Sequence, residues 1–382
     1  MGCKEMFGTV DELFSRYLDF WVEVCNEESP SSYKEGVDRV GRLFIREAQR
    51  LGFDHEVYHE DVSGDAVCIT MNGDVDAAPL VLSGHLDTVH PVGLFGTPPT
   101  RIEGGRIYGP GVCDCKGGCV AALLAMEALK INGYRKRPVK LVLQSDEEVG
   151  SQTSSKRTVD FMERCSKGAV AFLNSEPVAS YKITVERKGI IRFEFKIKGV
   201  AVHSACCYDG ASAVTEAAHK IIELEKFKNK DGITCNCGVI RGGTTPNTVA
   251  EECSFLADVR YKTAAELEEI KAFAAELAKK NFVEGTVTEL TVKSFRVSME
   301  RKDEVVGLAL KLCELARKHG LRERGLNASN GGADSADMVS RGIIAVDSLG
   351  VEGAWLHSVN EYAVIDSLGE SAKLFVAAAE EL

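Results

Sequence analysis

Short runs of apolar residues in the first half of the chain alternate with a segment of helical spacing. The apolar runs cover residues 80–82, 139–143 and 169–173, and residues 118–129 have the pattern of a buried helix. Strands that are buried on both faces read as continuous apolar runs, and their alternation with helices is typical of an α/β fold. The pattern predicts a mixed, largely parallel sheet flanked by helices.

The periodicity changes after residue 185. Residues 191–198 alternate between apolar and polar side chains, which predicts a strand with one solvated face and therefore an antiparallel sheet. The next segments predict a helix, two strands, a helix and a strand, over residues 212–227, 234–240, 252–260, 264–281 and 287–293. This β-α-β-β-α-β order is that of the ferredoxin-like α+β unit.

The α/β pattern resumes near the end of the chain, with an apolar run at residues 342–346 and an amphipathic helix over residues 367–382. We therefore predict a main domain formed by residues 1–185 and 297–382, with an inserted lid domain over residues 186–296. The length of 382 residues agrees with two domains, because a single hydrophobic core rarely keeps growing beyond about 250–300 residues.

Composition narrows the possible partners. The formal net charge is −11 and no long Lys/Arg run is present, so the surface repels phosphate backbones and we expect no nucleic-acid partner. No apolar stretch approaches the roughly 20 residues that a membrane helix needs. The first residues have neither the pattern of a signal peptide nor that of a myristoylation site. We predict a cytoplasmic protein without membrane association.

The thirteen cysteines are an odd number in a chain without an export signal, which favours free thiols over disulfides. Two pairs have CxC spacing, Cys113 with Cys115 and Cys235 with Cys237. This spacing is weak evidence for a metal site. We interpret these cysteines as free thiols and keep metal binding as the alternative.

Polar residues follow each predicted strand of the main domain. His85 and Asp87 come after the first strand, residues 146–148 after the second, Glu176 after the third, and the last strand leads to a loop that contains His357. A Gly-rich turn over residues 109–118 has Asp114 at its centre. Because ligands of open α/β sheets bind beyond the carboxyl ends of the strands, we expect these side chains to converge.

Histidine and carboxylate donors together favour zinc or cobalt over magnesium. A shared carboxylate can bridge two ions about 3.5–4 Å apart, and such a pair can activate water and polarise a carbonyl. Each residue alone has a simpler interpretation: residues 146–148 could form a hydrated turn, and the Gly-rich turn could bind phosphate, although it lacks the Walker pattern.

Five motifs resemble one known family. They are Ser83-Gly84-His85-Leu86-Asp87-Thr88-Val89, the stretch from Tyr108-Gly109-Pro110-Gly111 to Asp114-Cys115-Lys116-Gly117-Gly118, Asp146-Glu147-Glu148-Val149-Gly150, Ser175-Glu176-Pro177 and the late His357. Together they resemble the dizinc family of glutamate carboxypeptidase, acetylornithine deacetylase and succinyl-diaminopimelate desuccinylase. The stretch from His85 to Gly117 looks most like the glutamate carboxypeptidase branch. The resemblance implies a zinc-exopeptidase type of main domain and a lid that also forms the dimer.

By this resemblance, His85 and Glu176 would bind one metal ion, Glu148 and His357 would bind the other, and Asp114 would bridge the two. The ions would be zinc, with cobalt or manganese as alternatives.

The resemblance also implies roles for neighbouring residues. Asp87 would orient His85, and Glu147 would be the general base that activates water and later protonates the leaving amine, without binding metal itself. The family has a cis peptide after the bridging aspartate, here between Asp114 and Cys115.

Three residues of the predicted lid match family positions. His203, in Gly199-Val200-Ala201-Val202-His203-Ser204, resembles the histidine that reaches the partner subunit's site and would stabilise the oxyanion. Asn247 and Arg260 match positions that contact substrate, and the planar guanidinium of Arg260 suits a carboxylate. On the residues alone, Arg260 would be interpreted as a surface ion pair. His90 matches no motif, although its place after Asp87 would let it line the cleft.

Two features depart from the family pattern. Cys113 and Cys115 flank the bridging aspartate where relatives have small or apolar residues, so a nearby metal would make the enzyme sensitive to oxidants or heavy metals. The loop over residues 331–337 is nearer to the tripeptidase form, which leaves the substrate open.

These features predict a metal-dependent hydrolase that cleaves an amide or peptide bond in a small substrate with a free carboxylate. A carboxypeptidase, dipeptidase or tripeptidase is the first interpretation, and an N-acyl-amino-acid deacylase is the alternative. A catalytically inactive binding or dimerisation module is disfavoured, because the chain keeps Glu147 and the complete ligand set.

Overall fold

The computed structural model describes residues 2–178, 181–229 and 232–382. The chain folds into two compact units. The main unit comprises Met1–Val185, Arg301–Ala328 and Ala333–Leu382, and the inserted unit comprises Glu186–Glu300 with Ser329–Gly332. The predicted insertion ended at residue 296, so the inserted unit extends four residues further and also takes a short segment from the late loop.

A six-stranded sheet forms the centre of the main unit. Its strand order is β1-β2-β6-β3-β7-β14, made of Asp54–Tyr58, Ala66–Met71, Val139–Gln144, Leu80–His85, Ala171–Asn174 and Ala345–Val346. β6, β3, β7 and β14 run parallel to one another. β2 is antiparallel to its two neighbours, β6 and β1. The predicted α/β class with a mixed, largely parallel sheet is confirmed.

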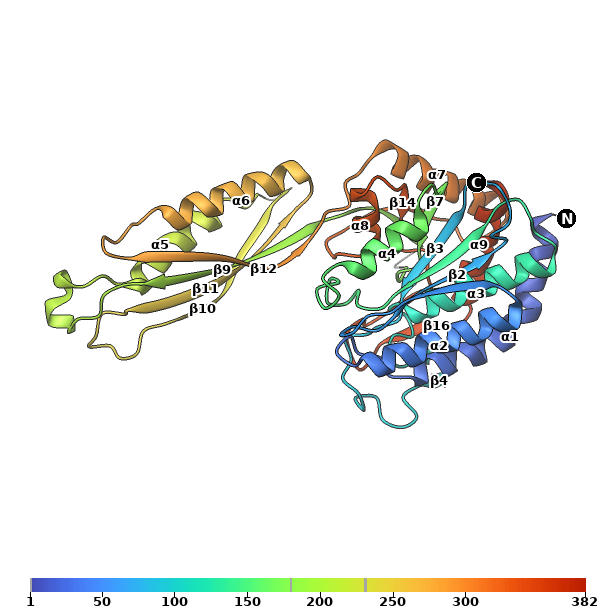
Figure 1. Cartoon of the computed structure of the whole chain (residues 1–382), viewed down its shortest axis with the longest axis horizontal. Helices are drawn as coiled ribbons and strands as arrows, with labels where there is room; N and C mark the ends of the chain where they lie inside the picture. Colours follow the sequence, from blue (N-terminus) through green and yellow to red (C-terminus); the bar gives the residue numbers. More distant parts are fainter. Residues whose placement is uncertain (1, 179–180, 230–231) are drawn as a thin grey trace. The chain divides into compact units, whose positions relative to one another are not determined.

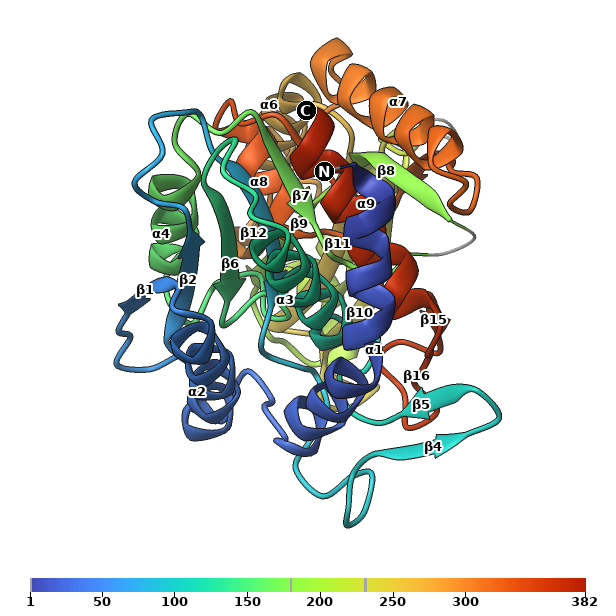
Figure 2. The same ribbon diagram turned by 90° about the vertical axis from the view of Figure 1, so that its right-hand side faces the viewer.

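Helices flank this sheet. They are α1 (Cys3–Asn26), α2 (Lys34–Leu51), α3 (Lys116–Ile131), α4 (Arg157–Ser166), α7 (Asp303–Lys318), α8 (Asp334–Ser340) and α9 (Ser367–Glu381). The buried helix α3 packs against β3 and β6 and contacts α1 and α9, while α4 and α8 contact β6 and β7. Figure 2 shows α3 in front of the sheet, with α1 beside it. None of the helices in the described part of the chain has both the length and the apolar character that a membrane crossing needs.

The residues that the structure describes form two smaller sheets besides the six-stranded sheet and the sheet of the inserted unit. One has the order β15-β16-β5-β4, made of Gly353–Ala354, Tyr362–Val364, Arg106–Tyr108 and Arg101–Glu103. It joins the chain near the Gly-rich turn to the late loop that contains His357. The other pairs β13 (Gly325–Ser329) with β8 (Lys182–Arg187).

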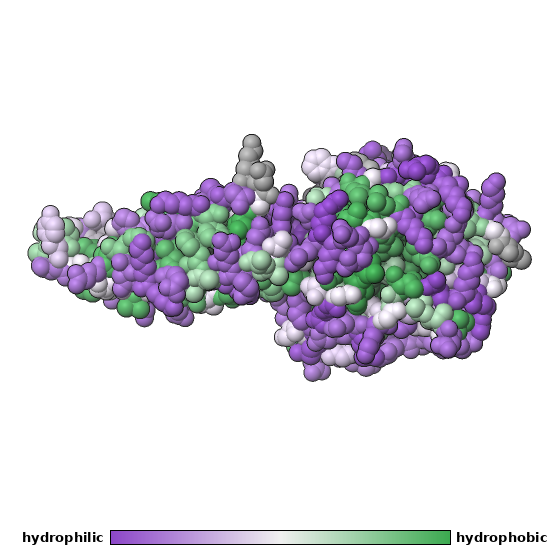
Figure 3. All heavy atoms as spheres, turned by 90° about the horizontal axis from the view of Figure 1, so that it is seen from above, coloured by the Kyte–Doolittle hydropathy of each residue, from purple (hydrophilic) through white to green (hydrophobic). Residues whose placement is uncertain are grey.

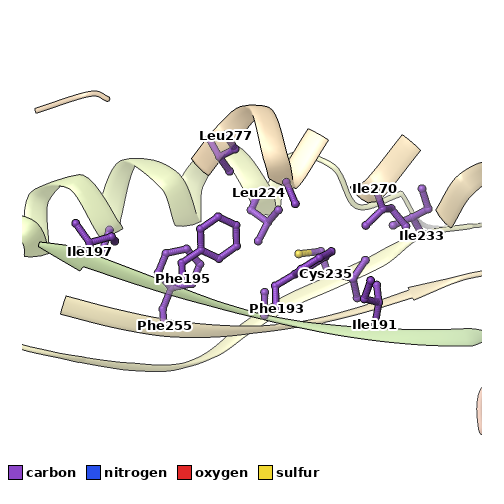
Figure 4. Packing of buried hydrophobic residues seen from close by; sticks show 14 of the residues in the cluster. Ile191, Phe193, Phe195, Ile197, Leu224, Ile233, Cys235, Phe255, Ile270 and Leu277 are labelled. Carbon is purple, nitrogen blue, oxygen red and sulfur yellow. The ribbon is translucent and has the colours of Figure 1, made fainter. Parts of the chain in front are cut away.

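The inserted unit is an antiparallel four-stranded sheet with two helices (Figure 1). Its elements are β9 (Gly189–Lys198), the 3₁₀ helix η1 (Ser204–Asp209), α5 (Ala213–Glu225), β10 (Thr234–Gly242), β11 (Glu252–Tyr261), α6 (Ala264–Lys279) and β12 (Val287–Arg296). The strand order β10-β11-β9-β12 and the element order are those of the predicted ferredoxin-like unit. Figure 4 shows apolar side chains of the sheet, among them Phe193, Phe195 and Phe255, packed beneath the helices.

One ion pair is fully buried in the inserted unit. Lys220 and Glu216 are both 0% exposed and lie 3.0 Å apart, one helical turn apart on α5. Lys220 also donates to the backbone oxygens of Leu277 and Lys280 at the end of α6. Glu216 accepts from backbone N–H groups at the start of the following loop. The pair therefore satisfies backbone groups that the helix end leaves without partners.

Candidate active site

Three neighbouring parallel strands of the main unit end at the same edge of the sheet. His85 is the last residue of β3 and lies opposite Gln144, the last residue of β6. Asn174, the last residue of β7, lies opposite Ser83. The loops that follow these strands contain Glu147, Glu148 and Glu176, so their side chains start from one edge, as expected for this type of sheet.

Asp114 lies between two imidazoles. Its Oδ1 is 3.2 Å from Nε2 of His85, and its Oδ2 is 3.2 Å from Nε2 of His357. Nε2 of His85 is also 3.7 Å from a carboxylate oxygen of Glu176, and Nε2 of His357 is 3.2 Å from one of Glu148. The structure thus brings together all five predicted ligands, with one carboxylate in the middle and one imidazole and one carboxylate on each side.

The ionisation of this cluster reflects its burial. Burial raises the pKa of Glu148 to about 8, although the hydrogen bond with His357 lowers it. Burial and the nearby Asp114 raise the pKa of Glu176. Burial acts in the same direction on Asp114, but hydrogen bonds with His357 and His85 hold its pKa well below the usual range. Hydrogen bonds to Asp114 and Glu148 raise the pKa of His357 to about 10. The raised pKa values mean that the cluster favours bound protons or another positive charge between its carboxylates.

This donor set fits metal ions. Ligand atoms of His85, Asp114 and Glu148 all lie within 4.8 Å of one another. Nδ1 of His85 is 2.9 Å from the backbone oxygen of Asp87, and because that oxygen can only accept, Nδ1 carries the proton. Nε2 then faces the carboxylates as an acceptor unless a cation or a second proton lies between them. Imidazole nitrogen and carboxylate oxygen together suit a zinc-like ion.

Asp87 is fully buried and fixes several parts of the site. Its carboxylate accepts the backbone N–H groups of Glu147 and Glu148, at 3.1 and 3.2 Å, and the hydroxyl of Ser31 at 2.6 Å. It also lies 3.4 Å from Nδ1 of His85. One side chain therefore orients both a histidine donor and the turn that contains the two glutamates. Asp146, the first acid of that turn, instead binds Ser154 and Thr158.

The backbone is unusual at two of the predicted ligands, Asp114 and His357. The peptide bond between Asp114 and Cys115 is cis, as predicted. His357 has a φ of 60°, in the left-handed region that a non-glycine residue rarely occupies. The turn is closed by Ser358, whose N–H and hydroxyl donate to the backbone oxygen of Trp355. A non-glycine residue with this φ persists where the surrounding structure fixes it, often at a functional site.

The sequence interpretation missed Glu361. This carboxylate is fully buried, accepts the backbone N–H groups of Cys113 and Asp114 at 3.0 and 3.1 Å, and lies 2.7 Å from Nε2 of His90. It therefore holds the turn on which the central carboxylate stands. His90 is 3% exposed and makes this contact, so it is a packing residue that supports Glu361. No motif surrounds Glu361, and only the folded chain brings it beside a turn 247 residues away.

The two cysteines that flank Asp114 are fully buried. The Cys115 sulfur accepts the backbone N–H of His85 at 3.2 Å and lies 4.0 Å from the Cys119 sulfur. It also forms a cluster of possible ligands with His85 and Glu176. A side chain at Gly84 would come within 2.8 Å of the same sulfur, so the glycine before His85 is required by this packing.

The three predicted substrate residues belong to the inserted unit, and the structure does not bring them together. His203 and Asn247 are neighbours, because Ser204 N–H donates to the backbone oxygen of Asn247 and both side chains are exposed. Arg260 lies near the other end of β11, where its guanidinium binds Asp258 and the backbone oxygen of Asn330. Glu252 and Arg260 lie eight positions apart along β11, which corresponds to about 27 Å.

The late loop over residues 331–337 is divided between the units. Gly331 and Gly332 belong to the inserted unit, where their backbone oxygens accept from Arg187. Asp337 belongs to the main unit, where it forms an ion pair with Lys156 at 3.0 Å.

Comparison with known proteins identifies relatives of the whole chain. Residues 81–381 match the model of peptidase family M20/M25/M40. The chain is 26% identical over 369 residues to carboxypeptidase G2 of Pseudomonas sp. (strain RS-16), which covers 93% of this chain and 86% of that protein. It is 23% identical to succinyl-diaminopimelate desuccinylase of Nitrosomonas eutropha, over 90% and 93% of the two chains.

Solved structures share the fold. The crystal structure of aminopeptidase PepT from Bacillus cereus superposes with a TM-score of 0.79 at 22% identity and covers 96% of this chain and 98% of that one. The M20 family metallo-carboxypeptidase Sso-CP2 from Sulfolobus solfataricus gives a TM-score of 0.73 at 19% identity, over 95% and 98% of the two chains.

Proposed function

The chain belongs to peptidase family M20/M25/M40, as its motifs predicted, and from this premise we propose that it hydrolyses an amide or peptide bond in a small substrate with a free carboxylate. The chain is a hydrolase of the metallopeptidase type. A carboxypeptidase, dipeptidase or tripeptidase activity is the proposed form. The observation that supports it most is the Asp114 carboxylate, which lies 3.2 Å from an imidazole on each side.

Two metal ions per chain are part of this proposal. His85 and Glu176 would hold one ion, Glu148 and His357 the other, and Asp114 would contribute an oxygen to each. Zinc is the proposed ion, with cobalt or manganese as alternatives. Bound ions of this kind supply Lewis acidity to the substrate carbonyl and lower the pKa of water.

Glu147 is the proposed general base. Its residue is 5% exposed, and its backbone N–H is fixed by Asp87, next to that of Glu148. The carboxylate takes a proton from the attacking water and later delivers it to the nitrogen of the leaving amine. Glu148, the next residue, has a different role because its oxygen faces His357.

Arg260 is the proposed anchor for the substrate carboxylate, because a guanidinium can form two parallel hydrogen bonds with it. Asn247 would add a hydrogen bond to the substrate, and His203 would stabilise the oxyanion that forms during attack. Since His203 and Asn247 lie beyond one end of β11 and Arg260 lies at the other, one substrate cannot contact all three residues of the same chain. Arg260 of one chain and His203 of a second chain would act together.

A homodimer formed through the inserted unit is therefore also proposed. The outermost strands of its sheet are β10 and β12, and such strands present unpaired backbone groups that can pair with another chain. Large apolar side chains on these strands are exposed, including Ile240 at 52% and Val292 at 51%. Figure 3 shows apolar residues, in green, interspersed with polar ones over the surface of this unit.

The second candidate is deacylation of an N-acyl amino acid, which needs the same hydrolytic groups. It is supported by the likeness to succinyl-diaminopimelate desuccinylase. A reducing compartment such as the cytoplasm is proposed for either activity, because the cysteines are free.

A hydrolysis screen tests the proposal and separates the two candidates. Dipeptides, tripeptides, γ-glutamyl compounds and acyl amino acids would be incubated with the protein after addition of zinc, cobalt or manganese. Cleavage of peptides with a free carboxylate, lost on treatment with a chelator and restored by the metal, is expected. Cleavage of acyl amino acids alone would favour the deacylase. Activity that survives complete metal removal would contradict both.

A further inference from the structure

Two cysteines and one glutamate form a cluster in the inserted unit that the proposed hydrolysis does not use. Cys235 and Cys237 lie on β10, and Glu225 is the last residue of α5. The two sulfur atoms and one carboxylate oxygen lie within 4.8 Å of one another. The cluster thus joins a strand to the end of the helix that packs on it.

Both cysteines contact the apolar cluster of this unit. Cys235 belongs to the cluster, and Cys237 packs against it. Cys235 is 5% exposed and lies among apolar side chains such as Leu224 and Ile233 (Figure 4).

A local irregularity of β10 brings the carboxylate to the sulfurs. The register between β10 and β11 shifts between Asn236 and Val239. The backbone N–H of Cys237 donates instead to a carboxylate oxygen of Glu225 at 3.0 Å. This hydrogen bond fixes Glu225 beside the strand.

The distances suit a thiophilic ion. Two sulfurs bound to a tetrahedral ion at about 2.3 Å lie about 3.8 Å apart, and a carboxylate oxygen lies about 3.5 Å from each. The atoms of the cluster are within 4.8 Å, so shifts of about 1 Å or less would complete the geometry. Two sulfurs with one oxygen favour zinc or cadmium over calcium or magnesium.

Charge is also balanced at this position. Two thiolates and a carboxylate around a divalent ion leave one negative charge, and the ammonium of Lys228 forms an ion pair with Glu225. Both sulfurs would bind the ion as thiolates, because the thiolate is the ligand form of cysteine.

We propose that Cys235, Cys237 and Glu225 form a binding site for a zinc-like divalent cation, separate from the catalytic centre, that ties the end of α5 to β10. The Glu225 side chain is 28% exposed, so the fourth position of the ion is open to water. The site does not depend on the proposed hydrolysis, because it lies wholly within the inserted unit.

Cadmium titration of the reduced full chain tests the site, with thiolate-to-cadmium charge-transfer absorption as the readout. We expect the Cys235→Ala/Cys237→Ala variant to lose absorption equal to two sulfur–cadmium bonds per chain. Glu225→Gln should weaken cadmium binding at this site about tenfold. Full absorption in the double variant, or no sulfur-bound cadmium in the wild-type chain, would overturn the proposal.

Matched variants control for other thiols. Cys206→Ser/Cys207→Ser changes two adjacent exposed cysteines of the same unit, and Cys3→Ser removes the thiol of another cluster, formed with His319 and Glu381. Both should keep the full signal, and loss of the signal in either would contradict the assignment. If the double variant fails to fold, the single variant Cys237→Ala at the edge of the core decides the question: retention of both sulfur–cadmium bonds there would also refute the site.

Discussion

The main unit and the inserted unit differ in how far their candidate functional side chains are buried. In the main unit, Asp87, Asp114 and Glu361 are buried at the sheet edge, and backbone N–H groups bind Asp87 and Glu361. In the inserted unit, His203 is exposed and Arg260 is half-buried, while the fully buried pair Lys220–Glu216 supports the fold. The difference supports the proposal that the main unit holds the reactive centre and that the inserted unit presents side chains to the substrate.

The buried pair should give the largest effect on stability. Lys220→Met leaves Glu216 without its cation and removes the donor to the end of α6, so we expect a loss of about 3–5 kcal/mol in the free energy of unfolding. Urea denaturation followed by circular dichroism would measure it. Lys226→Met, which breaks an exposed pair with Glu223, is the control and should change nothing measurable. Equal stability of the two variants would show that the inserted unit does not depend on buried charge.

Glu361 should matter less for folding and more for metal affinity. Glu361→Gln replaces an anion that accepts two backbone N–H groups and contacts His90, so the turn that contains Asp114 loses its anchor. We expect metal affinity to fall about 10–100-fold, measured by competition with a chromogenic chelator. Glu352→Gln changes a partly exposed glutamate paired with Arg322 and should leave affinity unchanged. Wild-type affinity in Glu361→Gln would mean that the fixed backbone alone positions Asp114.

The smallest expected change tests the inserted unit's role in substrate binding. Arg260→Lys keeps the charge but loses the planar pair of donors, so we expect KM for a substrate with a free carboxylate to rise about fivefold or more, with KM for its amide unchanged. Arg192→Lys is the matched control, because Arg192 also binds Asp258. A rise in KM for both the acid and the amide would assign Arg260 to structure rather than to carboxylate recognition.

Local patterns predicted most of the sheet and of the insertion. β3, β6 and β7 each contain a short, mostly apolar run because both faces of the sheet are covered, and β9 alternates because one face is solvated. The residues that follow the predicted strand ends were then the candidate ligands. Such patterns depend only on residues that are close in the sequence, so they predict strands and helices before the fold is known.

Features that depend on distant contacts were not predicted. The β15-β16-β5-β4 sheet joins segments about 250 residues apart, and its strands are too short for a periodic pattern. Glu361 has no local signal because its partners are backbone groups of a remote turn. The same reason explains Ser329–Gly332, which belongs to the inserted unit although the preceding residues of β13 belong to the main unit.

Two adjacent glutamates allow a direct test of the proposal that five side chains bind two ions while Glu147 acts on water. Metal content by mass spectrometry and kcat would be measured for Glu147→Gln and Glu148→Gln side by side. We expect Glu147→Gln to keep about two ions per chain and to lose a factor of about 100 or more in kcat, while Glu148→Gln should lose about one ion. Unchanged turnover in Glu147→Gln, or loss of metal from that variant with full occupancy in Glu148→Gln, would contradict it.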